Sequence, residues 1–199
     1  MLIVGGGVAG VSCALILGSA YKKAFVNTKQ IGIFMHQKAS MLQEAVFNNA
    51  YGIAPGTLGS TLLASSVQQL AQYPDVIQFA SEKVMAIHQL EEGFEVVTTK
   101  DTYFSAIVVV AVNSSETLFI KGLEKFVVPH GKTIPEKKRI QLKNVDHLVT
   151  RGLYVAGTLA GHRSQLAIAA GSGAAVATDI LTLWNDGVHS HSHDSLRKK

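Results

Sequence analysis

The sequence predicts an α/β domain built around a central, mainly parallel β-sheet. Two strand–helix pairs stand at opposite ends of the chain, and each begins with a short apolar run that ends in glycine. Between the pairs lies a stretch in which apolar and polar residues alternate, as in antiparallel strands. Of the 199 residues, 47% are hydrophobic, which suffices for one core and excludes general disorder. We expect a single domain over residues 1–186.

Charge and cysteine content exclude several classes of protein. The net charge of +4 is concentrated in the segment 132–143 and in the last three residues, so the sequence gives little support for a nucleic-acid-binding protein. We expect the basic segment to be a solvated hairpin. The single cysteine, Cys13, excludes an internal disulfide framework and a CxxC pair; it fits a reducing, cytoplasmic location and is expected to pack in the core.

The first part of the chain reads as alternating strands and helices. We expect a strand at Leu2–Gly5, a helix at Val8–Ala20, a second strand at Lys23–Thr28, a helix at Leu58–Gln72 and a strand at Val76–Ala80. Because Met1 stands inside the expected first strand, we expect that several leading residues are missing or misassigned.

The second part is predicted to return to the same sheet. A β-meander follows residue 80, and its last member, residues 106–112, is apolar enough to lie inside the main sheet. A final buried strand is expected at Gly152–Gly157. Residues 1–112 and 152–186 would then form the main sheet and helices, residues 113–151 a connecting segment, and residues 187–199 a disordered tail.

The segment Gln165–Trp184 is long and apolar enough to cross a bilayer. It contains Asp179, two glycines, Ser172 and two threonines, however. We therefore expect a helix packed against the sheet and no membrane insertion.

Gly5, Gly7 and Gly10 form a G-x-G-x-x-G motif between the first strand and the first helix. In this setting the glycines permit a tight turn, close approach of a pyrophosphate and close helix–strand packing. The motif predicts a Rossmann-like FAD/NAD(P)-binding domain. An acidic residue that binds the adenosine ribose is expected about twenty residues further on; the sequence has Asn27 there, which either binds the ribose more weakly or is a turn residue.

Four blocks of sequence resemble one family: LIVGGGVAGVSCALILG, NNAYGIAPGTLGSTLL, the meander ending in FSAIVVVAV, and GLYVAGTLAGHRSQLAIAAGSGAAVATDIL. The chain resembles the flavin domain of thioredoxin reductase-type flavoproteins, of the pyridine nucleotide–disulfide oxidoreductase superfamily. The resemblance implies that both glycine-rich stretches contact one FAD, and that relatives commonly pair as homodimers. The residues implied to bind FAD are Gly5, Gly7, Val8, Ala9, Gly10, Asn27, Val112, Gly157, Thr158, Gln165 and Leu166.

The chain also departs from that family. About forty residues separate the meander from the final strand, too few for the inserted NADPH domain. Asn27, Val112–Asn113 and Thr158 replace residues that favour FAD in the family. We expect an FAD-dependent oxidoreductase that acts on a small molecule or with a partner electron donor, without NADPH-driven disulfide reduction of its own. The alternative is a non-catalytic FAD-binding or apo scaffold subunit.

His162 and Arg163 precede the final helix, where the resemblance places the flavin ring. Either residue is a candidate catalytic group; Arg163 could stabilise an anionic reduced flavin or be a solvated loop residue. His189, His191 and His193 alternate in the tail, where a disordered segment is expected rather than a metal site.

Overall fold

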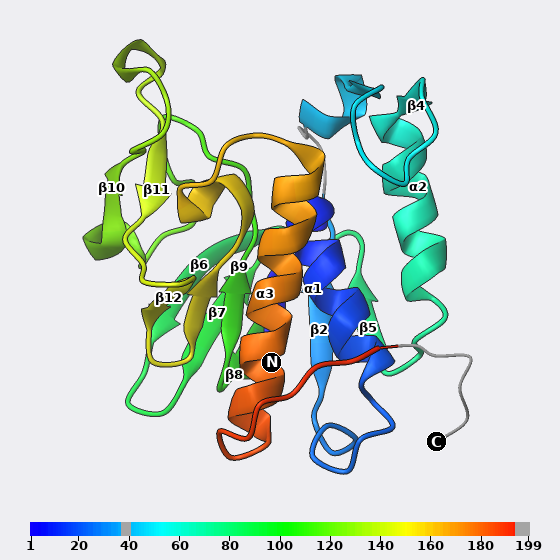
Figure 1. Ribbon diagram of the computed structural model, residues 1–199. Helices are drawn as coiled ribbons and strands as arrows, with labels where there is room; N and C mark the ends of the chain where they lie inside the picture. Colours follow the sequence, from blue (N-terminus) through cyan, green and yellow to red (C-terminus); the bar gives the residue numbers. More distant parts are fainter. Residues whose placement is uncertain (37–40, 194–199) are drawn as a thin grey trace.

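The computed structural model describes residues 1–36 and 41–193. Its centre is a six-stranded sheet in the order β12-β13-β9-β1-β2-β5 (Figure 1). All neighbours are parallel except β12, which runs antiparallel to β13. The strands are β1 (Leu2–Val4), β2 (Ile31–Phe34), β5 (Val76–Phe79), β9 (Val108–Val110), β12 (Leu148–Thr150) and β13 (Leu153–Val155). The predicted α/β fold class is confirmed.

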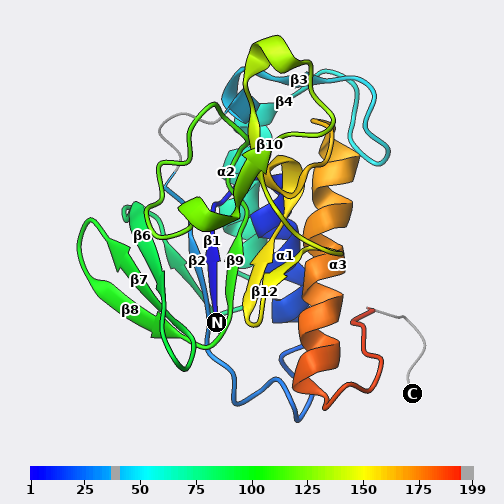
Figure 2. The ribbon, with the colours of Figure 1, turned by 90° about the vertical axis from the view of Figure 1, so that its left-hand side faces the viewer.

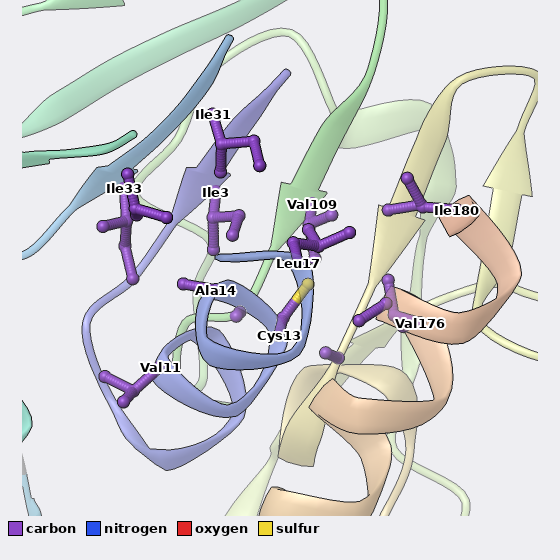
Figure 3. Packing of buried hydrophobic residues seen from close by; sticks show 14 of the residues in the cluster. Ile3, Val11, Cys13, Ala14, Leu17, Ile31, Ile33, Val109, Val176 and Ile180 are labelled. Atoms are coloured by element: carbon purple, nitrogen blue, oxygen red, sulfur yellow. The ribbon is translucent and has the colours of Figure 1, made fainter. Parts of the chain in front are cut away.

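Two helices cover one face of this sheet. In β1, Ile3 points into a core formed with α1 (Val8–Ser19) and α3 (Leu166–Trp184), as Figure 3 shows. Cys13 is completely buried there, and burial raises the pKa of its thiol, so it is a packing residue as predicted. α2 (Gly59–Leu70) lies beside α1 at the β5 edge of the sheet.

The meander covers the other face. Leu2 and Val4 of β1 point into a second core cluster, which contains Phe94 and Val96 from the middle strand of the meander. Its strands are β6 (Val84–Gln89), β7 (Phe94–Thr98) and β8 (Thr102–Ser105), and they form an antiparallel sheet of their own. Figure 2 shows this sheet to one side of the main sheet, with α1 and α3 on the other. The prediction that the chain then enters the main sheet is confirmed by β9.

The second strand lies later in the chain than predicted. Residues 23–28 form turns, and β2 occupies Ile31–Phe34, in register with β1 and β5. All four residues of β2 are buried, which favours strand formation there. Gly32 fits because a Cβ at this position would lie 2.9 Å from Leu2 Cδ2 and 2.9 Å from Phe79 Cε2. The strand expected at Lys23–Thr28 was wrong.

The segment 113–151 is more than a connection. It contains an antiparallel hairpin, β10 (Val127–Pro129) with β11 (Ile140–Leu142), and two 3-10 helices, η2 (Glu124–Phe126) and η3 (Pro135–Lys137). It also supplies β12, so the main sheet resumes before Gly152. Four further elements lie at the ends of the sheet and beside α2: η1 (Met41–Glu44), β3 (Val46–Phe47), β4 (Thr57–Leu58) and η4 (Gly157–Ala160).

The described part of the tail folds back along the molecule. Residues 187–193 run from the end of α3 towards the end of α1 (Figure 1). Ser190 is buried and its N–H donates to Thr182 Oγ1 at 3.1 Å, while the Ser19 hydroxyl donates to Ser192 Oγ at 2.9 Å. The disorder predicted for 187–199 is therefore wrong for residues 187–193; residues 194–199 lie outside the described residues.

The helix α3 packs as a core helix. By length and composition alone, Leu166–Trp184 could cross a membrane, which is weak support for a span. One face of α3, which includes Val176, Ala177 and Ile180, is buried in the core shared with α1. At Gly173 a Cβ would collide with the carbonyl oxygen of Ala9, so the two helices touch through backbone.

We expect Gly173→Ala to lower the free energy of unfolding by about 2 kcal/mol, because the added methyl group overpacks a backbone contact. Gly171 is the matched control: it lies in the same helix, and a Cβ there would meet nothing within 4 Å. Gly171→Ala should leave stability unchanged or raise it by roughly 0.5 kcal/mol through helix propensity. Urea unfolding of the two variants checks this, and equal effects would contradict the close helix contact.

Candidate functional site

A cavity of about 700 Å³ lies beyond the carboxyl ends of the parallel strands, the usual ligand position in open α/β sheets. Its floor is the glycine loop after β1, and its back is the turn after β13 with the start of α3. One side wall comes from η1 and β3, and the other from the hairpin β10–β11. The lining includes Gly7, Val8, Ala9, Ala111, Val112, Asn113, Ser114, Gly157, Thr158, His162, Ser164, Gln165, Leu166 and Ala169.

The three glycines of the motif have different surroundings. Gly5 has φ +117°, and a Cβ there would lie 2.5 Å from the carbonyl oxygen of Ala111 in the turn after β9. At Gly10 a Cβ would collide with the carbonyl oxygen of Gly5. At Gly7, in contrast, a Cβ would meet nothing within 4 Å. The first and third glycines are thus required by packing, whereas the second leaves space open on the cavity.

Gly7 is also the N-cap of α1, with extended backbone and no capping side chain. The N–H groups in the first turn of a helix have no partner within the helix. Here they begin at a residue that lines the cavity, and no acidic residue stands in that turn. The loop can therefore accept an anionic group close to its backbone.

Thr158 links the turn after β13 to the turn after β9. Its hydroxyl donates to Asn113 Oδ1 at 2.9 Å and accepts the N–H of Ser114 at 3.0 Å. Its carbonyl oxygen lies 3.1 Å from Nε2 of the buried His130. The Lys132 N–H donates to His130 Nδ1 at 3.1 Å, which leaves the proton of a neutral His130 on Nε2, facing Thr158.

A chain of polar contacts leads from the cavity into the protein. His162 lines the cavity, and its Nε2 lies 3.0 Å from Nε2 of His147. The same His147 atom lies 3.0 Å from Ser172 Oγ, which accepts the Gly157 N–H at 2.8 Å. One of the two facing imidazole nitrogens must hold the proton of their hydrogen bond, so the pair can pass a proton between the cavity edge and the interior.

Burial favours the neutral forms of these two histidines. Desolvation lowers the pKa of His147, against the opposing charges of Asp179 and Asp146. Desolvation also lowers the pKa of His162, and the charges of His147, Lys132 and His130 add to the effect. Burial raises the pKa of Asp179.

The cavity brings together most of the residues predicted to bind a cofactor. Eight of them line it, and Gly5 and Gly10 shape its loop: the eight are Gly7, Val8, Ala9, Val112, Gly157, Thr158, Gln165 and Leu166. The two candidate catalytic residues differ in position: His162 lines the cavity, whereas the exposed Arg163 does not.

Asn27 does not reach the cavity. It lies in a turn before β2, near the amino ends of the parallel strands, whereas Gly7 follows the carboxyl end of β1. The residues that follow the carboxyl end of β2 are Met35 and His36. The ribose-binding role expected of Asn27 was wrong because it depended on the misplaced strand.

Sequence reasoning missed both side walls. The η1–β3 wall is mainly apolar and consists of Met41, Leu42, Ala45 and Phe47. The hairpin wall contains His130, Lys132, Thr133, Ile134, Lys137 and Arg139. The hairpin itself was predicted, but it is not simply solvated. The run of basic residues was the only sequence signal of this hairpin. Nothing in the sequence shows which of these basic residues line the cavity.

Within residues 1–36 and 41–193, no group of three or more His, Cys, Asp or Glu side chains could hold a metal ion. The tail histidines lie ring against ring, with centroid separations of 5.6 Å for His189–His191 and 4.5 Å for His191–His193.

No protein-family model and no curated protein matches the chain. Solved structures do match. A thioredoxin reductase from Gloeobacter violaceus aligns with a TM-score of 0.76 at 12% identity, over 98% of this chain and 97% of that chain. An oxidoreductase from Agrobacterium tumefaciens aligns with a TM-score of 0.69 at 12% identity, over 92% and 97% of the two chains.

A ferredoxin-flavin thioredoxin reductase from Clostridium acetobutylicum aligns with a TM-score of 0.66 at 15% identity, over 93% of this chain and 96% of that chain. At identities this low, structural similarity establishes the fold but not the activity. The fold of this chain is that of the thioredoxin reductases, as the sequence motifs predicted.

Proposed function

We propose that this protein binds FAD in the cavity and acts as a flavin-dependent oxidoreductase. The glycine loop, Gly5 to Gly10, would hold the diphosphate. Thr158 would contact the ribitol, and Gln165 and Leu166 at the start of α3 would border the ring. When bound, the flavin supplies the capacity to accept and donate electrons.

The observation that carries the proposal is the contrast among the glycines. A Cβ at Gly10 would collide with the carbonyl oxygen of Gly5, whereas a Cβ at Gly7, which lines the cavity, would meet nothing within 4 Å. Packing explains the first glycine and the third but gives no reason for the second. A diphosphate that approaches the backbone at Gly7 supplies that reason.

The residues present fit this cofactor, with one restriction. The proton of the Thr158 hydroxyl is already donated to Asn113, so towards a ribitol hydroxyl Thr158 can only accept. The exposed Asn113 also lines the cavity, and its amide N–H groups are suitable donors there. Weak rather than tight retention of FAD follows from a hydroxyl in the place of a carboxylate.

His162 would be the proton donor or acceptor at this site. It stands at the cavity edge, and the contact with His147 Nε2 gives its imidazole a partner that can take or return a proton. His147 contacts Ser172 and does not line the cavity. It would therefore position His162 and exchange a proton with it.

The electron donor or acceptor would be a small molecule or a partner protein. The described segment between β9 and β13 contains a hairpin and short helices rather than a second nucleotide-binding unit, and the chain has one cysteine, so we propose no NADPH-driven disulfide reduction by this chain alone. A cytoplasmic location and pairing into a homodimer stay predictions.

We expect the purified protein to bind FAD and Gly7→Val to weaken that binding at least tenfold, because the side chain would occupy the space of the diphosphate. Flavin absorbance after gel filtration and titration with FAD measure the effect. Gly171→Val is the matched control, since Gly171 is equally unhindered but lies outside the cavity lining. Full FAD affinity in Gly7→Val would refute the placement of the diphosphate at Gly7, and no FAD binding by the wild type would favour the apo scaffold interpretation.

We also expect stability to fall as the pH is lowered from 7.5 to 5.5. The folded pKa of His147 lies below its ordinary value of 6.5, so in this range the unfolded chain takes up a proton that the folded chain does not. The stabilisation is complete above pH 6.5 and is lost as the pH falls towards the folded pKa. His147→Asn, which tolerates the positive φ of 71° at this position, should reduce the loss. Urea unfolding at both pH values checks this, with His189→Asn as the control; an unchanged pH dependence in His147→Asn would refute the assignment.

A further inference from the structure

The hairpin wall of the cavity is cationic. Lys132, Lys137 and Arg139 all line the cavity. Among the described residues that line it, none is an aspartate or a glutamate. Cations that share one wall repel one another, and the low-dielectric walls of a cleft strengthen their field.

The basic segment divides into residues that line the cavity and residues that do not. Lys138 and Lys143 belong to the same segment but do not line the cavity. The acidic residue of the segment, Glu136, does not line it either. Lys132 and Lys137 border the cavity and are also exposed to solvent, whereas Arg139 is half-buried.

Hydrogen bonds hold the wall in place. Arg139 Nη1 donates to the carbonyl oxygen of Ser114 at 2.6 Å, and the Ser114 hydroxyl donates to the carbonyl oxygen of Ile140 at 2.6 Å. The imidazole of His130 bonds to Thr158 on the neighbouring turn. The Arg139 guanidinium keeps further N–H groups for a ligand. The hairpin is thus fixed to the strand ends before any ligand arrives, which lowers the entropy cost of binding.

The wall belongs to one end of the cavity. Lys132 lies near enough to His162 for its charge to help lower the pKa of that histidine. The apolar η1–β3 wall stands on the other side of the α3 start, as Figure 1 shows for the two elements. A ligand that spans the gap would meet cations at the hairpin and apolar side chains opposite.

We propose that the hairpin end of the cavity binds a small organic anion, with its negative group at Lys132, Lys137 and Arg139. This proposal goes beyond the flavin function proposed above and rests on the cavity and its cations alone.

The geometry favours a small molecule over an acidic protein. Three of the cations line one end of the cavity of about 700 Å³ that is also proposed to hold the flavin, and concave spaces of this size are typical of small-molecule sites. A protein partner would instead be steered by the charges of the basic segment that do not line the cavity, Lys138 and Lys143.

Two probes of equal shape and different charge test the proposal: naphthalene-2-sulfonate and naphthalene-2-sulfonamide. Their dissociation constants are measured by calorimetry on the protein as purified, with its flavin content recorded by absorbance. The sulfonate should bind at least tenfold more tightly, and raising the salt concentration should weaken only the sulfonate. Lys132→Gln/Lys137→Gln should reduce its affinity about tenfold. Lys138→Gln/Lys143→Gln, with the same charge change on the same segment, should change it less than twofold.

Several results would overturn the proposal. Equal affinities for the two probes would show that the wall does not select charge. A loss confined to Lys138→Gln/Lys143→Gln would place the anion outside the cavity and favour an acidic protein. A fall in FAD retention in Lys132→Gln/Lys137→Gln with an unchanged preference for the sulfonate would assign the cations to the cofactor. Absence of flavin from a protein that still prefers the sulfonate would refute the proposed function and keep the anion site.

Discussion

The structure depends on close backbone contact between α1 and its neighbours. Gly10 packs on the carbonyl oxygen of Gly5, and Gly5 approaches that of Ala111. Gly173 of α3 approaches the carbonyl oxygen of Ala9. These contacts bring together the turn after β1, the turn after β9 and the helix α3. Any side chain at these three positions would separate the elements, since a packed core transmits such displacements rather than absorbing them.

The same contacts create the cavity. The strands β1, β9 and β13 are adjacent and parallel, so their carboxyl ends meet at one edge of the sheet. The turns that follow them carry Gly7, Val112 and Thr158, which all line the cavity. The site is a consequence of the topology, and its chemistry comes from the side chains that the loops add.

Much of this could be predicted from the sequence because the signals are local. The run LIVG followed by glycines at fixed spacing predicts β1, the turn and α1, and the alternation in 84–98 predicts the meander. The strand β2 was missed for a physical reason. The run IGIF contains a glycine, which disfavours an isolated strand, but here the space beside Gly32 is filled by Leu2 and Phe79. Tertiary packing outweighed the local preference. Because the second strand was misplaced, the ribose-binding role predicted for Asn27 was misplaced as well.

The side walls of the cavity could not be predicted, because they depend on which way a side chain turns. Lys137 and Lys138 are adjacent and identical in chemistry, yet Lys137 lines the cavity and Lys138 does not. Lys138 has φ +45° and ends η3 in the left-handed conformation, a local backbone geometry that the sequence does not signal. His147, with φ +71°, is likewise placed by backbone geometry beside His162, fifteen positions further along the chain.

The histidine pair and the cationic wall affect one another through charge. A bound anion at Lys132 would offset a positive charge that now disfavours protonation of His162. Protonation of His162 would then become easier at the moment the site is occupied, and His147 would share the proton through its Nε2. The protonation of His162 is thus coupled to the occupancy of the hairpin end, because Lys132 is close enough to His162 for its charge to lower the pKa of that histidine, and no described carboxylate lines the cavity.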